Sequence, residues 1–120
     1  MDRVFAAEEL GERGDHAAVQ PLVATLSGLT YEVRAEFGLA TAIIEALANL
    51  DDAEVANTIV DALRKTCGDD VVPEVACRAL VRLRATGSVP LLNAMLRQRE
   101  FSDHADELER TIDALMTARA

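Results

Sequence analysis

The sequence predicts an all-α protein, an α-solenoid of about seven helices stacked as three and a half helix pairs. The main observation is a set of apolar positions that recurs in three successive stretches. Adding 37 to the residue numbers of the first stretch, and a further 33 to those of the second, returns apolar residues everywhere except at Asn93. A period of roughly 30–45 residues is typical of stacked helix pairs. The three sets are Ala7, Leu10, Val19, Leu22, Val23 and Leu26; Ile44, Leu47, Ala56, Ile59, Val60 and Leu63; and Cys77, Leu80, Val89, Leu92, Asn93 and Leu96.

Composition favours the same fold class. Half of the 120 residues are hydrophobic, which is too many for a disordered chain and enough for one domain with its own core. Only four residues are aromatic, so closely packed aliphatic helices fit better than a β-sandwich. We therefore treat residues 1–120 as one domain with repeats at about 3–28, 31–67 and 72–99, followed by a capping helix at about 103–118.

Turn residues mark the first two expected helices. The first spans about residues 3–13, and the second, capped by Asp15, spans about 15–27 and ends before Gly28. Pro21 lies within the first two turns of the second helix. It is tolerated there because its missing N–H falls among groups that have no intrahelical partner.

The third and fourth helices are expected at about 31–50 and 52–67, with Asp52 as the cap of the fourth. Spacings of four and three residues define an apolar stripe on the third helix. Further apolar residues widen this stripe, as expected for a helix with neighbours on two sides. The stripe comprises Val33, Phe37, Ala40, Ile44 and Leu47, widened by Leu39, Ile43 and Leu50.

Three more helices complete the expected stack. The fifth, at about 72–85, has Pro73 in its first turn, and the sixth, at about 89–99, has Ser88 as its expected cap. The last helix has one apolar and one polar side, as a terminal repeat requires. Its apolar stripe comprises Phe101, Ala105, Leu108, Ile112 and Leu115.

The segment from Leu10 to Leu26 resembles a HEAT repeat of the phycobilisome-lyase type, which shows Leu-Gly, a turn with Gly-Asp, then Ala-Val-x-x-Leu and a closing Leu. The match loosens at Leu47 to Leu63, where Asp51-Asp52 replaces Gly-Asp, and further at Leu80 to Leu96, where Arg84-Ala85 holds the turn. The resemblance implies the fold but hardly the function, because HEAT proteins include adaptors, lyase subunits and enzymes.

The carboxy-terminal part has a second, shorter resemblance. Its segments are similar to small HEAT-like immunity proteins of bacterial toxin systems, which show a Ser-Ile-Pro-x-Leu helix, a loop with an aromatic and an acid, and an Arg-x-x-x-x-Ala-Leu helix. The similarity implies a role in neutralising a toxin domain. The segments are Ser88 to Leu92, Phe101 to Asp103, and Leu108 to Leu115.

Catalytic and metal-binding patterns are not found in the sequence. There is no P-loop, GxGxxG or GxSxG motif, and no His-Glu dipeptide of the kind that HEAT-like di-iron hydroxylases carry. We interpret His16 and His104 as exposed residues at helix starts, and acid pairs such as Asp69-Asp70 as capping and solubilising groups. Cys77 is expected in the core and Cys67 as a free thiol. We expect no metal site and no cofactor.

The net charge of −9 argues against nucleic-acid binding and fits a basic protein partner. Residues 71–100 reverse the sign, with 5 basic and 2 acidic residues. We interpret this basic island as paired with acidic helices and solvated, with a basic contact patch as the alternative. Its members are Arg78, Arg82, Arg84, Arg97 and Arg99. We find no secretory signal and no run of about 20 apolar residues, so the expectation is a cytoplasmic monomer without membrane contact.

These observations predict a non-catalytic protein-binding module. Two alternatives stay open, an immunity protein against a bacterial toxin domain and an accessory subunit of a bilin-lyase-like enzyme. Every second helix of such a stack lines one side, so we expect the partner to contact positions outside the apolar sets on the second, fourth and sixth helices. The candidate binding residues are Gln20, Asn57, Asp61, Lys65, Leu91 and Gln98.

Overall fold

The computed structural model describes residue 17 and residues 19–50 and 55–119. Within these ranges the chain is helical, without a strand, and none of its helices is long and apolar enough to cross a membrane. Two of the described elements are short 3₁₀ helices, one on each side of the helix at 89–96. The helix expected at about 3–13 lies outside the described residues, as do Asp15 and Asp52. The elements are α2 (Val19–Gly28), α3 (Arg34–Asn49), α4 (Ala56–Lys65), α5 (Val71–Arg82), η3 (Thr86–Ser88), α6 (Val89–Leu96), η4 (Arg99–His104) and α7 (Ala105–Arg119).

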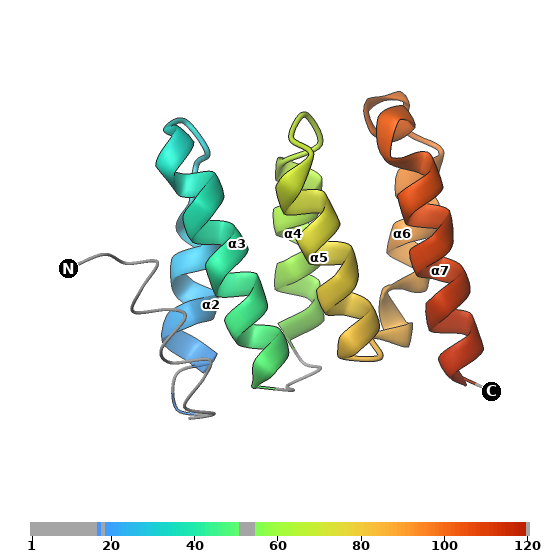
Figure 1. Cartoon of the computed structure of the whole chain (residues 1–120), viewed down its shortest axis with the longest axis horizontal. Helices are drawn as coiled ribbons and strands as arrows, with labels where there is room; N and C mark the ends of the chain where they lie inside the picture. Colours follow the sequence, from blue (N-terminus) through green and yellow to red (C-terminus); the bar gives the residue numbers. More distant parts are fainter. Residues whose placement is uncertain (1–16, 18, 51–54, 120) are drawn as a thin grey trace.

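The described helices form two layers (Figure 1). In one layer α5 packs between α3 and α7, and in the other α4 packs between α2 and α6. Consecutive helices run in opposite directions and alternate between the layers, so α2 packs on α3, α4 on α5 and α6 on α7. This arrangement gives each layer one side that faces the shared core and one side that faces outward.

The core forms from the recurring apolar positions. Every described member of the three sets is buried except Val23 and Leu96, which are half-buried, and Asn93, which is exposed. The single polar member of the sets is thus also the one that faces solvent. On α3, small alanines such as Ala40 and Ala46 are buried among larger aliphatic residues, which lets neighbouring helices pack closely.

Predictions about the starts of two helices are confirmed. Pro21 is the third residue of α2, and Pro73 the third residue of α5, both positions where the missing N–H breaks no helical bond. The acid pair before α5 acts as expected, because Asp69 Oδ2 accepts hydrogen bonds from the backbone N–H groups of Val71 (3.1 Å) and Val72 (2.9 Å).

Two other predictions about helix starts are wrong. Ser88 precedes α6, but its side chain makes no capping hydrogen bond. The preceding 3₁₀ turn gives Ser88 a helical backbone instead of the extended one that a capping serine needs. In addition, Pro90 lacks one of the N–H groups from which the serine hydroxyl would accept a hydrogen bond. Val33, expected on the apolar stripe of α3, is 58% exposed because it precedes the helix with an extended backbone.

Candidate functional site

The candidate binding residues all lie in the α2–α4–α6 layer or directly after it. Gln20 is on α2, Asn57, Asp61 and Lys65 are on α4, Leu91 is on α6, and Gln98 lies between α6 and η4. All are exposed except Asp61, which is half-buried. Leu91 is 42% exposed, so α7 leaves it accessible. We call these six residues the polar row.

Asp61 and Lys65 are the members of the polar row that the structure brings into contact. Asp61 Oδ2 lies 3.1 Å from Lys65 Nζ, and Asp61 Oδ1 accepts a hydrogen bond of 2.9 Å from Arg64. Burial raises the pKa of the Asp61 carboxyl, but the hydrogen bonds and charges of Arg64 and Lys65 outweigh this effect and hold it below its ordinary value. Lys65 Nζ also donates to the carbonyl of Ser27 (3.4 Å), which ties α4 to the end of α2. The Asp61 carboxylate is therefore already engaged by two cations of its own helix.

A hollow of about 610 Å³ adjoins this ion-pair cluster. It lies between the α2–α3 connection and the α4–α5 connection, and Lys65 belongs to both the hollow and the polar row. The lining combines aromatic rings, hydroxyls and charged groups, so it suits a partner side chain with an apolar body and a polar end. The lining residues are Thr30, Tyr31, Arg34, Phe37, Lys65, Thr66, Gly68 and Asp69.

Tyr31 is the most unusual residue of this hollow. Its φ of 62° is in the left-handed region, which bulky residues rarely adopt. Glu36 Oε1 holds this turn by accepting hydrogen bonds from the backbone N–H groups of Thr30 (2.9 Å) and Tyr31 (3.3 Å). The ring packs on Phe37 with centroids 5.3 Å apart. Strained backbone at the edge of a hollow is a common feature of binding sites.

The hydroxyl of Tyr31 is buried, and no described residue offers it a hydrogen bond. Burial raises the pKa of Tyr31 to about 12, with smaller contributions from the negative charges of Asp61 and Glu36. Tyr31 is half-buried. The sequence offers no local signal for its strained backbone or for its unpartnered hydroxyl.

A second hollow, of about 390 Å³, lies beside Asn57 at the start of α4. Its other wall is the turn between α5 and α6, which includes Arg84 and Ser88. Arg84 has a φ of 54°, and the buried Ser88 hydroxyl has no hydrogen-bond partner within the described ranges. Apart from Asp61 and Lys65, no hydrogen bond or ion pair of the described residues joins one member of the polar row to another.

The basic island of the sequence does not form a single patch. Arg78 and Arg82 lie on α5, Arg84 lies in the turn after α5, and Arg97 and Arg99 follow α6, which belongs to the other layer (Figure 1). All five arginines are exposed, and none forms an ion pair within the described part of the chain, where both ion pairs involve Asp61. The island is thus solvated as expected, but its expected pairing with acidic helices is not seen there.

The interpretation of His104 as an exposed residue is wrong. His104 is 7% exposed, and its Nε2 lies 2.9 Å from the backbone carbonyl of Cys67. The 3₁₀ helix η4 repeats every three residues, so His104 shares the inward face of the buried Phe101. His16 lies outside the described residues. In the described ranges no three His, Cys, Asp or Glu side chains are grouped so that they could hold a metal ion.

The two cysteines are as expected. Cys77 is buried, and burial raises the pKa of its thiol to about 11, so the thiol is inert at neutral pH. Cys67 is half-buried and free.

No protein-family model matches the chain, and neither a curated protein nor a solved structure is significantly similar to it.

Proposed function

We propose that this protein is a non-catalytic HEAT-like repeat module, an α-solenoid that binds another protein through the polar row. The observation that carries the proposal is the position of this row. Five of its six members are exposed on or directly after alternate helices of one layer, although none of them is needed for the core. Stacked helix pairs characteristically present such a row to a partner.

The row offers three kinds of contact. The amides of Gln20, Asn57 and Gln98 can each donate and accept hydrogen bonds. Leu91 offers exposed apolar surface. The hollow beside Lys65 can accept a side chain that packs on Tyr31. Binding through side chains on packed helices needs little rearrangement of the backbone, which lowers its entropic cost.

The net charge of the chain has a different role. At −9 it attracts a basic partner over long distances and raises the association rate. Near the row, by contrast, the charge of Asp61 is already matched by Arg64 and Lys65. We therefore expect salt to slow association more than it speeds dissociation.

The test is a triple variant, Gln20→Arg, Asn57→Arg and Gln98→Arg. Asp61 is left intact because its replacement would break the ion pairs with Arg64 and Lys65. Wild-type and variant proteins are immobilised, exposed to the native lysate, and the captured proteins are quantified by mass spectrometry. A matched control carries Ala35→Arg, Ser102→Arg and Thr117→Arg, which are exposed and lie outside the α2–α4–α6 layer.

We expect the row variant to capture at least about tenfold less of the partner, and the control to capture within about twofold of the wild type. Both variants should keep the wild-type melting temperature within a few degrees, because exposed substitutions cost under about 0.5 kcal/mol each. Unchanged capture by the row variant would refute the proposal. The identity of the captured protein separates the adaptor role from the immunity and lyase-subunit roles.

A further inference from the structure

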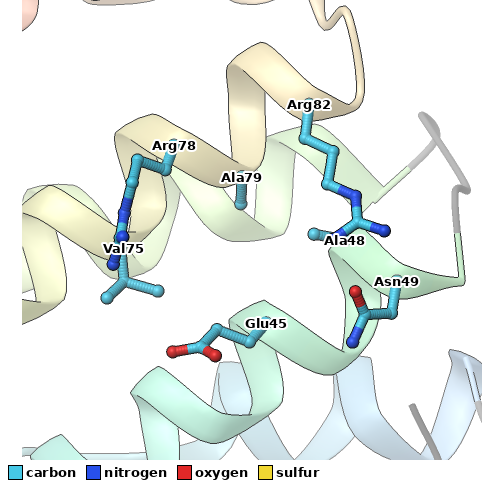
Figure 2. A pocket seen from close by; sticks show the side chains of 7 residues that line it. All are labelled: Glu45, Ala48, Asn49, Val75, Arg78, Ala79 and Arg82. Atoms are coloured by element: carbon cyan, nitrogen blue, oxygen red, sulfur yellow. The ribbon is translucent and has the colours of Figure 1, made fainter. Parts of the chain in front are cut away.

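A groove runs between α3 and α5 on the outward side of the other layer (Figure 2). Its volume is about 240 Å³. Arg78 and Arg82 of α5 lie on one side, and Glu45 and Asn49 of α3 lie on the other, with Ala79 between the two arginines. We call this feature the α3–α5 groove. Its lining residues are Glu45, Ala48, Asn49, Val75, Arg78, Ala79 and Arg82.

The groove is hollow because its floor side chains are short. Ala48, Val75 and Ala79 are each 4% exposed and fill the base, while the long side chains at the rim are exposed. An apolar floor between polar walls suits a segment that lies lengthwise along the two helices. Its methyl and methylene groups would cover the alanines, and its polar groups would reach the rim.

The charges of the two walls are unequal. Arg78 and Arg82 are one helical turn apart, so both guanidinium groups point to the same side of α5. Neither forms an ion pair with any described residue, although Glu45 lies on the facing wall. Arg78 also lines an adjoining hollow between α5 and α7, together with Arg110, Glu74 and Glu107, and its charge opposes the rise in the pKa of Glu107 that burial causes. The α5 wall therefore offers two guanidinium groups that form no ion pair with a described residue, although Arg78 has Glu74 and Glu107 nearby on its far side. Guanidinium groups bind carboxylates in a bidentate manner.

We propose that the α3–α5 groove binds an acidic segment of a partner protein, whose carboxylates one helical turn apart pair with Arg78 and Arg82. Glu45 determines the orientation, because it repels a carboxylate on the α3 side and leaves the α5 side favourable. The Asn49 amide donates a hydrogen bond to the segment or accepts one from it, with the backbone or a side-chain amide as the partner. This site is separate from the polar row, and its ligand has the opposite charge to a basic partner.

The probe is a short alanine-based peptide with two glutamates at an i, i+4 spacing, compared with the same peptide carrying glutamines. Binding is followed by chemical-shift changes in ¹⁵N-labelled full-length protein. We expect the glutamate peptide to shift the Nε–H signals of Arg78 and Arg82 and the amide signals of Ala48 and Ala79. The glutamine peptide should bind at least about tenfold more weakly.

The variants separate local recognition from general charge. The pair Arg78→Glu and Arg82→Glu should weaken binding at least about tenfold, whereas the charge-matched control, Arg97→Glu and Arg99→Glu, should weaken it less than about threefold. Glu45→Gln should strengthen binding, since it removes the repulsive group. Equal losses in the two pairs, absence of binding, or shifts confined to other helices would overturn the proposal. Stronger shifts with a single-stranded oligonucleotide than with the glutamate peptide would also overturn it. The polar-row variant should bind the peptide normally, so a failure at either surface leaves the test of the other intact.

Discussion

Replacing Tyr31 by phenylalanine should stabilise the protein. The substitution removes a hydroxyl that is buried without a hydrogen-bond partner in the described structure and keeps the ring that packs on Phe37. A buried polar group without a partner costs about 1–3 kcal/mol, and the half-exposed ring of Tyr31 places this case at the low end. We expect a gain of about 1 kcal/mol, which corresponds to about 4 °C in melting temperature for a domain of this size.

Urea denaturation followed by circular dichroism measures this change, because the Phe variant contains no tyrosine or tryptophan for fluorescence. Tyr31→Leu is the control: it removes the hydroxyl and the ring together, and should destabilise the protein through loss of the contact with Phe37. If Tyr31→Phe were destabilised by more than about 0.5 kcal/mol, the hydroxyl would have a partner after all and the reasoning would be refuted.

The same residue gives a direct titration. Tyr31 is the only tyrosine and the chain has no tryptophan, so absorbance at the phenolate band reports this group alone. We expect a midpoint of about 12 instead of 10.0. Because the pKa of Tyr31 is higher in the folded state than in the unfolded state, the stability that the protonated hydroxyl contributes is fully present below pH 10. This contribution is lost as the pH rises towards 12. Asp61→Asn should lower the midpoint, since the Asp61 charge contributes to the rise; a wild-type midpoint near 10 would contradict the burial of the hydroxyl.

Three further predictions concern the described contacts. Asp69→Ala should cost about 1 kcal/mol in urea denaturation, because the first N–H groups of α5 lose their acceptor, whereas Asp70→Ala should cost under about 0.5 kcal/mol. His104→Ala should cost at least about 1–3 kcal/mol by the same measurement, since it leaves the Cys67 carbonyl without its partner; a smaller loss would show that water replaces the imidazole. Glu107→Gln should raise the melting temperature at neutral pH. Burial is the chief cause that raises the pKa of Glu107, so wild-type stability falls as the pH rises through the folded-state pKa. The gain in melting temperature from the substitution should therefore vanish at a pH well below 4.5, the ordinary pKa of a glutamate.

The helices could be predicted because their signals are local. In α7 the apolar residues recur every three or four positions, and Leu108, Ile112 and Leu115 are all buried as that spacing requires. Glycine residues indicated where helices end in the same way, and α2 ends at Gly28. Errors arose where one local signal competed with another. Ser88 has the residue type of a cap, but the backbone of the 3₁₀ turn before α6 overrides it.

The candidate site was predictable only in part. Gln20, Asn57 and Gln98 are exposed because they are outside the apolar stripe, which the sequence shows directly. The half-burial of Asp61 and the contact of His104 with a carbonyl 37 residues away depend on which turns the fold brings together. Sequence spacing within one helix contains no information on such contacts.

The two proposed surfaces reconcile an acidic chain with an acidic ligand. Charges separated by more than about 8 Å are largely screened at physiological salt, so the distant acidic groups behind the net charge of −9 act only weakly on a segment bound in the groove. At contact distance the nearest groups decide, and in the α3–α5 groove these are Arg78 and Arg82 against the single carboxylate of Glu45. The polar row belongs to the α2–α4–α6 layer, whereas the groove lies between α3 and α5 of the other layer. Because they share no residue, the two surfaces can act independently, one on a partner steered by the whole charge and one on a segment recognised by two arginines.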